Sequence, residues 1–307
     1  GPNGAGLGAC EGSGALKIVL LGSGGQVGRA LVGTLGSIGD VAAFDRAALD
    51  VGDVAAVRSV VRAQKPDVVV NASAHTDVDG AERDEAAADR INRDAVAALG
   101  EECRSLRIGL VHYSTDFVFD GKATRPYRED DPTAPLGAYG RSKRAGEKAL
   151  VEMEAPALIL RTAWVYSVGR KSFVSAILKA ARERDALRVV SDQVGNPTFA
   201  GDLAVATALI LFGVRGDAFA GIASARSIYH LAGRGFTSRY DLARAIVELD
   251  PKKSEHRVKT IDPVASSEYP LPAQRPAFAP LDCSKAKATF GVELPDWRQA
   301  LARALAQ

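Results

Sequence analysis

The sequence predicts an α/β fold, namely a doubly wound parallel sheet with a smaller C-terminal lobe. Three observations lead to this prediction. Short apolar runs rich in β-branched residues alternate with stretches of helical spacing, as in sheets built from strand–helix–strand units. A glycine-rich turn follows the first apolar run. After about residue 165 the alternation weakens and proline becomes more frequent, which indicates the second lobe.

The expected elements can be followed along the chain from residue 16. Strands are expected over residues 16–21, 40–45, 67–73, 108–115 and 157–166, because these are short apolar runs such as LKIVLL and DVVVNAS. Helices are expected over residues 29–37, 53–64 and 81–106, and around YGRSK at residues 139–143. Ligands of such sheets bind beyond the carboxyl ends of the strands, so the candidate residues should lie there.

Composition excludes several classes of function. The 307 residues carry 39 Lys and Arg against 37 Asp and Glu, a net charge of +2, which argues against a broad surface for a nucleic acid polymer. No apolar run is long enough to span a membrane. The three cysteines and four histidines show no metal-binding spacing, and the sparse cysteines predict a cytoplasmic protein.

The stretch GSGGQVG places Gly22, Gly25 and Gly28 between a strand and a helix. Glycine allows a tight turn and lets phosphate approach backbone N–H groups at the start of the helix. The spacing is a variant of the usual dinucleotide motif, and the alternative is a turn without a ligand. The strand–turn–helix context favours a Rossmann-type dinucleotide site.

The end of the second strand bears on the choice of cofactor. Asp45 can bond an adenosine ribose hydroxyl, whereas Arg46 beside it can accommodate a 2′-phosphate. We therefore expect NADPH, with NADH as the alternative; Arg46 could equally be a solvated surface side chain.

The division into domains follows from these elements. We expect a flexible tail or cloning remnant over residues 1–15, because GPNGAGLGACEGSGA is rich in small residues and has no apolar stretch. The dinucleotide-binding domain is expected over residues 16–165 together with 187–230. A smaller, discontinuous substrate-binding lobe is expected over residues 166–186 and 231–307.

YGRSK places Tyr139 and Lys143 on one helix face. A nearby ammonium favours the phenolate, so we expect Lys143 to lower the pKa of Tyr139 and suit it for proton transfer at neutral pH. The sequence STD at residues 114–116 ends the fourth strand at the same sheet edge, where a hydroxyl could hold a carbonyl oxygen. Alternatively, these side chains cap the following segment. His112 lies inside an apolar run and is expected to be a satisfied core histidine.

These motifs together resemble the extended short-chain dehydrogenase/reductases, and among them the family of dTDP-4-dehydrorhamnose reductases. The resemblance runs from about Lys17 to the C-terminus. It depends on GSGGQVG, NASAHTDVDGAE, STDFVFDG, PYREDDPTAPLGAYGRSKRAGE, RTAWVY, DQVGNPT and RPAFAPLDCSKAKATFG.

The resemblance implies an NADPH-dependent reduction of the 4-keto group of dTDP-4-dehydro-L-rhamnose, giving dTDP-L-rhamnose. It implies that Thr115, Tyr139 and Lys143 are catalytic. The implied cofactor site comprises Gly22, Gly25, Gln26, Val27, Gly28, Asp45, Arg46, Asp50, Ala72, Ser73, Ala74, Thr76, Tyr139 and Lys143. The implied substrate site comprises Val78, Thr115, Asp116, Phe117, Trp164, Asn196 and Arg275. Asn71 would brace the backbone beside the cofactor.

Departures from the family pattern leave the identity of the substrate sugar undetermined. Phe117 stands where relatives usually carry tyrosine, and Ala279 and Pro280 replace a common Ser-x. One alternative is therefore a 4-ketoreductase of another dTDP-4-keto-6-deoxyhexose. A second is a non-catalytic NADP-binding subunit like the regulatory subunit of methionine adenosyltransferase, and a third is a 4-epimerase with bound NAD⁺. Some family members bind Mg²⁺ at a dimer contact; the sequence assigns no Mg²⁺ ligand, and a homodimer stays open.

Overall fold

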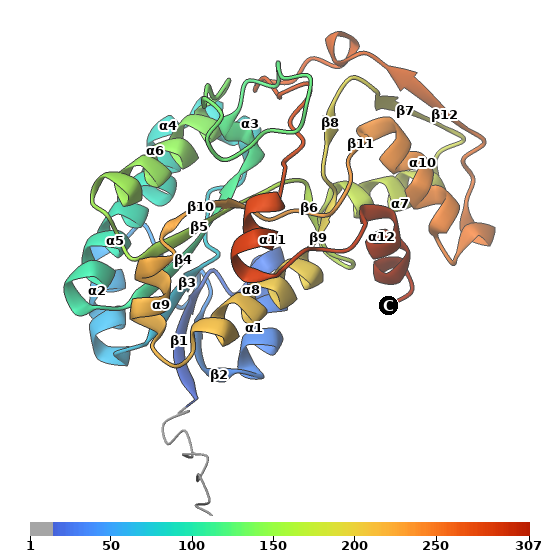
Figure 1. The fold of residues 1–307 in the computed structure, drawn as a ribbon. Helices are drawn as coiled ribbons and strands as arrows, with labels where there is room; N and C mark the ends of the chain where they lie inside the picture. Colours follow the sequence, from blue (N-terminus) through green and yellow to red (C-terminus); the bar gives the residue numbers. More distant parts are fainter. Residues whose placement is uncertain (1–14) are drawn as a thin grey trace, which may run out of the picture.

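The computed structural model describes residues 15–307, so the predicted tail lies almost entirely outside the described residues. A parallel sheet in the strand order β10-β5-β4-β3-β1-β2 forms the centre of the molecule (Figure 1). Its strands are β1 (Leu16–Leu21), β2 (Gly39–Phe44), β3 (Val68–Asn71), β4 (Gly109–Thr115), β5 (Ala157–Thr162) and β10 (Ser227–His230). The predicted doubly wound α/β fold is confirmed.

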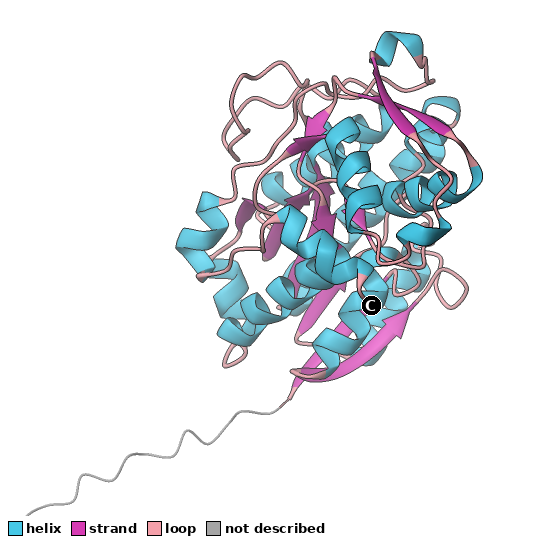
Figure 2. Cartoon of the chain, turned by 90° about the vertical axis from the view of Figure 1, so that its right-hand side faces the viewer, coloured by secondary structure: helices cyan, strands magenta, loops and turns pink. Residues whose placement is uncertain are grey.

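Helices cover both faces of this sheet (Figure 2). The strands show no strict alternation of polar and apolar residues, because both of their faces are buried. In β1, Ile18 and Leu20 face one helical layer, and Val19 and Leu21 face the other. The first layer holds α1 (Gln26–Gly36), α8 (Ala200–Val214), α9 (Ala218–Ser224) and α11 (Ser284–Phe290). The second layer holds α2 (Val54–Gln64), α5 (Ala95–Leu106) and α6 (Ala138–Glu152).

A smaller lobe has its own apolar core and stands apart from the central sheet (Figures 1 and 2). Its helices are α7 (Phe173–Glu183), α10 (Arg239–Leu249) and α12 (Trp297–Leu305). Three two-stranded sheets accompany them: β7 (Ala186–Val190) with β12 (Thr260–Val264), β8 (Val194–Gly195) with β11 (Thr237–Ser238), and β6 (Val165–Tyr166) with β9 (Thr198–Phe199).

Packing suggests two changes to the expected domain boundaries. Strand β7 pairs with β12 and not with the central sheet, although residues 187–230 were expected in the dinucleotide-binding domain. Helix α11 places Ala286 and Phe290 in the core of the central sheet, although residues 231–307 were expected in the smaller lobe. We therefore propose to assign β7 to the smaller lobe and α11 to the larger one.

The single helix predicted over residues 81–106 is wrong. The chain forms α3 (Val78–Arg83), α4 (Glu85–Asp89), a π-helical turn (Arg90–Asp94) and then α5. Asp84 ends α3 with a non-helical backbone (φ of −142° and ψ of 77°), and its carboxylate accepts the Ala87 N–H at 2.9 Å, which starts α4. The π-helical turn buries Asn92, whose amide bonds the backbone of His75 and the hydroxyl of Ser142. The break thus ties this segment to the active-site helix α6.

The fifth predicted strand is also divided. Strand β5 ends at Thr162, and Trp164 adopts a left-handed backbone with φ of 43°. That conformation is unfavourable for a bulky residue and turns the chain out of the central sheet. The next residues, β6, pair with β9. The tryptophan side chain is thereby placed at the junction of the two lobes.

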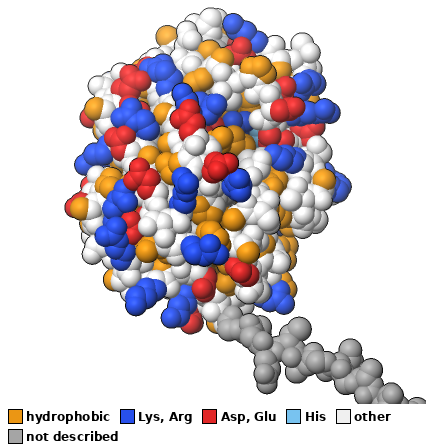
Figure 3. Space-filling view, turned by 60° about the vertical axis from the view of Figure 1, so that its left-hand side comes forward, with side chains coloured by type: hydrophobic (Ala, Val, Ile, Leu, Met, Phe, Trp, Pro, Cys, Tyr) orange, Lys and Arg blue, Asp and Glu red, His pale blue; other side chains and the backbone are white. Residues whose placement is uncertain are grey.

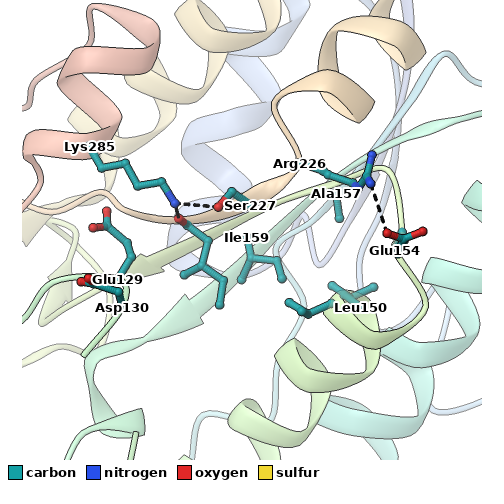
Figure 4. A pocket seen from close by; sticks show the side chains of 12 residues that line it. Glu129, Asp130, Leu150, Glu154, Ala157, Ile159, Arg226, Ser227 and Lys285 are labelled. Atoms are coloured by element: carbon teal, nitrogen blue, oxygen red, sulfur yellow. Dashed lines mark hydrogen bonds and ion pairs between the residues drawn. The ribbon is translucent and has the colours of Figure 1, made fainter. Parts of the chain in front are cut away.

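Edge strand β10 is covered by side chains (Figure 4). The Lys285 ammonium donates to the carbonyl oxygen of Ile228 at 2.8 Å. The Glu129 carboxylate accepts the N–H of His230 at 2.8 Å. A cavity of about 660 Å³ lies beside them, with apolar side chains such as Leu150 in its wall. It contains none of the predicted site residues, so it is separate from the candidate site.

The surface is of mixed charge. Figure 3 shows a face on which Lys and Arg side chains are interspersed with Asp and Glu, in keeping with the small net charge. Within residues 15–307, no single helix has the length and apolar composition to cross a membrane. Helices α8 and α9, which are bent by 107° to each other, have that length and composition only when taken together.

Candidate active site

A cleft of about 830 Å³ lies at the carboxyl ends of β1, β3, β4 and β5, between the sheet and the smaller lobe. Fourteen of the predicted site residues line it: Gly25, Gln26, Val27, Ala72, Ala74, Thr76, Val78, Thr115, Asp116, Phe117, Tyr139, Lys143, Trp164 and Arg275. Residues that are up to 250 positions apart in the chain (Gly25 and Arg275) therefore meet in one place.

The glycine turn is shaped by close backbone contacts. Gly22 has φ of 80°, and a Cβ there would lie 2.6 Å from the backbone nitrogen of Ser73. A Cβ on Gly28 would lie 2.1 Å from the carbonyl oxygen of Gly22. These two glycines do not line the cleft, but only glycine permits this turn, because any side chain would collide with backbone.

The start of α1 fits a pyrophosphate. Gly25 is its N-cap without a side-chain capping bond, and the first turn contains no acidic residue. The N–H groups of that turn are therefore free of side-chain partners and point a partial positive charge into the cleft. Gly25, Gln26 and Val27 line the cleft at this point, which supports a dinucleotide in it.

Besides Gly22, Gly28 and Ser73, three further predicted cofactor residues lie outside the cleft lining: Asp45, Arg46 and Asp50. Asp45 follows β2 beside the glycine turn, where its carboxylate accepts the N–H groups of Ala47 and Ala48 at 3.0 and 2.9 Å. Arg46 beside it is exposed. Asp50 accepts the Gly52 N–H at 2.9 Å. Asp45 lies against the glycine turn, since a Cβ on Gly24 would be 3.3 Å from the Asp45 Cβ, whereas Asp50 is engaged in its own loop.

Thr115 both caps a turn and faces Tyr139. Its hydroxyl accepts the N–H of Phe117 at 3.1 Å and donates to the Asp116 carboxylate at 3.1 Å. The Phe117 ring packs edge-on against the Tyr139 ring, with centroids 5.6 Å apart. The Thr115 side chain therefore caps the turn, as the alternative interpretation predicted. It also lies beside Tyr139, as the catalytic interpretation requires.

Lys143 does not lower the pKa of Tyr139 as predicted. Burial raises the pKa of Tyr139 to about 12, and a hydrogen bond with Thr115 opposes this rise. Lys143 Nζ contacts the Tyr113 carbonyl oxygen at 2.6 Å and His112 Nε2 at 3.3 Å, and among the described residues no hydrogen bond joins it to the Tyr139 hydroxyl. Burial lowers the pKa of Lys143 to about 8, and only Glu147 opposes it.

Asp116 is buried with one oxygen unpaired. It is 2% exposed, and its Oδ2 has no hydrogen-bond partner among the described residues. Burial raises the pKa of this carboxyl to about 7, against the Thr115 hydrogen bond and the nearby Arg239 charge. A group in this state can donate or accept a hydrogen bond with a ligand hydroxyl.

Trp164 forms the wall between the lobes together with Arg239. The guanidinium of Arg239 lies 3.6 Å from the centroid of the Trp164 ring, and burial lowers its pKa to about 10. Gly195 makes room for the indole, because a Cβ there would lie 2.6 Å from a Trp164 ring carbon. Arg275 is held at the cleft by Asp79, with a shortest distance of 2.8 Å.

Asn196 was predicted to contact substrate, but its side chain is used inside the protein. It donates to the carbonyl oxygens of Gly233 and Gly235 at 3.2 and 2.8 Å, and it accepts the N–H of Leu281 at 2.7 Å. It is buried and does not line the cleft. Ser73 likewise turns away, donating its hydroxyl to Asn71.

Sequence reasoning missed three cations that line the cleft. Arg170, Lys171 and Arg239 come from the smaller lobe and belong to none of the motifs. With Lys143 and Arg275 they make five basic side chains in the lining, against the single carboxyl of Asp116. This excess of positive charge suits ligands that carry several phosphates. Among residues 15–307, no cluster of three or more His, Cys, Asp or Glu could hold a metal ion.

Comparison with known proteins identifies the family. The sequence pattern described as the RmlD substrate binding domain matches residues 16–307. The chain belongs to the RmlD family. This membership confirms the resemblance to dTDP-4-dehydrorhamnose reductases that the motifs indicated.

Individual relatives support the same family. The RmlD-family chain is 42% identical over 289 residues to a dTDP-4-dehydrorhamnose reductase of Burkholderia thailandensis, covering 93% of this chain and 97% of that protein. It is 39% identical over 294 residues to a probable dTDP-4,6-dihydroxy-2-methyloxan-3-one 4-ketoreductase of Streptomyces antibioticus, covering 94% of each. The crystal structure of the dTDP-4-dehydrorhamnose reductase of Bacillus anthracis in complex with NADP superposes with a TM-score of 0.86 at 28% identity, covering 95% of this chain and 99% of that one.

Proposed function

We propose that this RmlD-family protein reduces the 4-keto group of dTDP-4-dehydro-L-rhamnose to dTDP-L-rhamnose, with NADPH as the reductant. The observation that carries the proposal is the meeting of Thr115, Tyr139 and Lys143 in one cleft with the uncapped start of α1. The five basic side chains in the lining suit the two diphosphates of cofactor and nucleotide sugar.

Each side chain has a defined task in this reaction. When bound, the nicotinamide supplies a hydride to C4 of the sugar. The Tyr139 hydroxyl transfers its proton to the former carbonyl oxygen. The Thr115 hydroxyl turns its hydrogen from the Asp116 carboxylate to that oxygen and donates a hydrogen bond to it. Lys143, as an ammonium, would donate hydrogen bonds to the nicotinamide ribose. Positioning supplies much of the rate enhancement, because the tyrosine and the cofactor turn are held by separate rigid elements.

The neighbouring side chains hold the sugar nucleotide. Asp116 bonds a sugar hydroxyl through its unpaired oxygen, and Trp164 packs against the sugar ring. Arg239 and Arg275 pair with the diphosphate. The predicted preference for NADPH over NADH rests on Arg46 and on the NADP in the Bacillus anthracis structure.

The first test follows the absorbance of NADPH with dTDP-4-dehydro-L-rhamnose as substrate. The parent protein should consume NADPH, and Tyr139→Phe should lower kcat by about 10²- to 10⁴-fold because the proton donor is lost. Tyr269→Phe is the matched control, since Tyr269 is exposed and outside the cleft lining. A Tyr139→Phe protein as active as the parent would rule out this mechanism.

A second candidate is a 4-ketoreductase of another dTDP-4-keto-6-deoxyhexose. The Streptomyces antibioticus relative and the Phe117 side chain beside Tyr139 favour it. Turnover of dTDP-4-dehydro-L-rhamnose should be compared with turnover of its C5 epimer. A higher kcat/KM for the epimer would replace the rhamnose assignment by this one.

Location and assembly complete the proposal. We place the enzyme in the cytoplasm, in keeping with the free thiols of Cys103 and Cys283. A homodimer stays a prediction, which light scattering of the purified protein would test.

A further inference from the structure

A chain of buried hydrogen bonds lies beneath Lys143. His112 is 0% exposed, and its Nε2 lies 3.3 Å from Lys143 Nζ. On the other side of the ring, Nδ1 lies 3.1 Å from Nδ2 of Asn71. The side-chain amide oxygen of Asn71, Oδ1, accepts the backbone N–H of Ser73 at 3.1 Å and the Ser73 hydroxyl at 2.5 Å. The sequence predicted His112 to be a satisfied core histidine, and this arrangement also connects it to Lys143.

The Ser73 backbone N–H decides how the Asn71 amide is turned. A backbone N–H can only donate, so the amide oxygen must face Ser73 and the amide NH₂ must face His112. Nδ1 of His112 then accepts a hydrogen bond and carries no proton. Burial lowers the pKa of His112 well below its usual value, so the ring is neutral. A neutral imidazole has one N–H, which must therefore be on Nε2, facing Lys143.

This tautomer disfavours a charged lysine. The hydrogen on Nε2 points the positive end of the N–H dipole at Lys143 Nζ, 3.3 Å away. A neutral amine can accept that hydrogen with its lone pair, whereas an ammonium has no lone pair to offer. We propose that His112, held in the Nε2–H tautomer by Asn71, is a positioning residue that controls how readily Lys143 carries its proton.

The other charged groups around Lys143 do not cancel this effect. On its own helix, Glu147 favours the ammonium, but Glu147 is paired with Arg161 on β5 through two bonds of 2.8 Å. Tyr139 is neutral, since its pKa is about 12. Asp116, at the end of β4, faces Tyr139 and Arg239. His112 is thus the polar contact of Nζ that, like burial, favours the neutral amine of Lys143 over the ammonium.

Nuclear magnetic resonance of the free protein tests the tautomer without any assumption about activity. The chain contains four histidines, so a ¹⁵N-histidine sample gives a sparse long-range ¹H–¹⁵N spectrum, and His112→Gln assigns the His112 signals. We expect the proton on Nε2 and none on Nδ1 at both pH 7 and pH 9. A proton on Nδ1 of His112 would overturn the proposal.

Two variants test the effect on Lys143, and this kinetic test rests on the proposed function. Asn71→Asp offers a carboxylate to Nδ1–H, which moves the proton and turns Nε2 into an acceptor for Nζ. His112→Gln removes the N–H dipole. In both, Lys143 should keep its proton to higher pH, so the basic limb of the kcat/KM profile should move upward by about one pH unit.

His230→Gln is the matched control, because it also removes a buried neutral imidazole but makes no contact with Lys143. Its basic limb should coincide with that of the parent. An unchanged limb in both folded test variants would refute the role of His112. If the parent reduces no keto-sugar, the proposed function fails, and the spectrum still decides the tautomer.

Discussion

Single residues at the cleft do several tasks at once. Thr115 caps the turn after β4 and also faces Tyr139. Trp164 turns the chain out of the sheet and also forms the wall beside Arg239. A residue that positions backbone and ligand together cannot be replaced without changing both. Residue types in the motifs could therefore be read from the sequence, whereas their hydrogen-bond partners could not, because those come from other elements.

Gly195 provides a test at this scale. Gly195→Ala would place a Cβ 2.6 Å from the Trp164 ring and displace the indole from Arg239. Because a shift of about 1 Å can cost a factor of about 100, we expect kcat/KM for the nucleotide sugar to fall by about 10- to 100-fold. Steady-state kinetics and tryptophan fluorescence measure this. Gly33→Ala in α1 meets nothing within 4 Å and should keep parental kinetics; equal kinetics in both variants would contradict the packing argument.

Elements were predictable where the pattern was local and strong. Strands β1, β3 and β4 were predicted from apolar runs, and the helix after GSGGQVG follows from strand–turn–helix order. Strand β10, with the sequence SIYH, was not predicted, because it is no apolar run. The break at Asp84 and the end of β5 were missed. Asp84 ends one helix and caps the next through a hydrogen bond that helix propensity alone does not predict. Trp164 has a left-handed backbone conformation at the point where the chain passes from the central sheet into the smaller lobe.

Edge strand β10 offers a test at the scale of elements. Lys285→Met removes the donor to the Ile228 carbonyl while keeping most of the apolar stem. We expect the free energy of unfolding to fall by about 1–2 kcal/mol and aggregation on mild heating to rise, because an edge strand loses its cover. Urea titration and light scattering measure the two effects. Lys287→Met on the same helix should behave like the parent, because within residues 15–307 its ammonium bonds only the exposed Glu293. If this variant is equally impaired, the edge is not the cause.

The whole molecule holds buried ionisable groups whose effects on stability differ in sign. Burial lowers the pKa of His230 to about 3. As the pH falls below about 6.5, this histidine is therefore protonated in the unfolded chain but stays neutral in the folded chain. Stability due to this group is complete above pH 6.5 and is lost as the pH falls toward 3. Burial raises the pKa of Asp116 to about 7, which acts in the opposite direction, since the folded chain is protonated first.

A comparison of two proteins isolates the histidine. The free energy of unfolding of the parent should fall more steeply between pH 6 and 4.5 than that of His230→Gln, by about 1.4 kcal/mol per pH unit. Urea titrations across this range measure both slopes, and Asp116 contributes equally to each. Parallel slopes would show that His230 is protonated in the folded protein.

Local patterns in the sequence were enough to establish the α/β fold, the glycine turn, the Tyr139 and Lys143 pair and the family. They were enough because each of these rests on neighbouring residues or on periodic burial. The folded chain was needed to show that Asn196 braces the smaller lobe, that Arg239 enters the cleft and that His112 faces Lys143. These relations join residues from separate elements, and their energies depend on distance and burial, which exist only once the chain has folded.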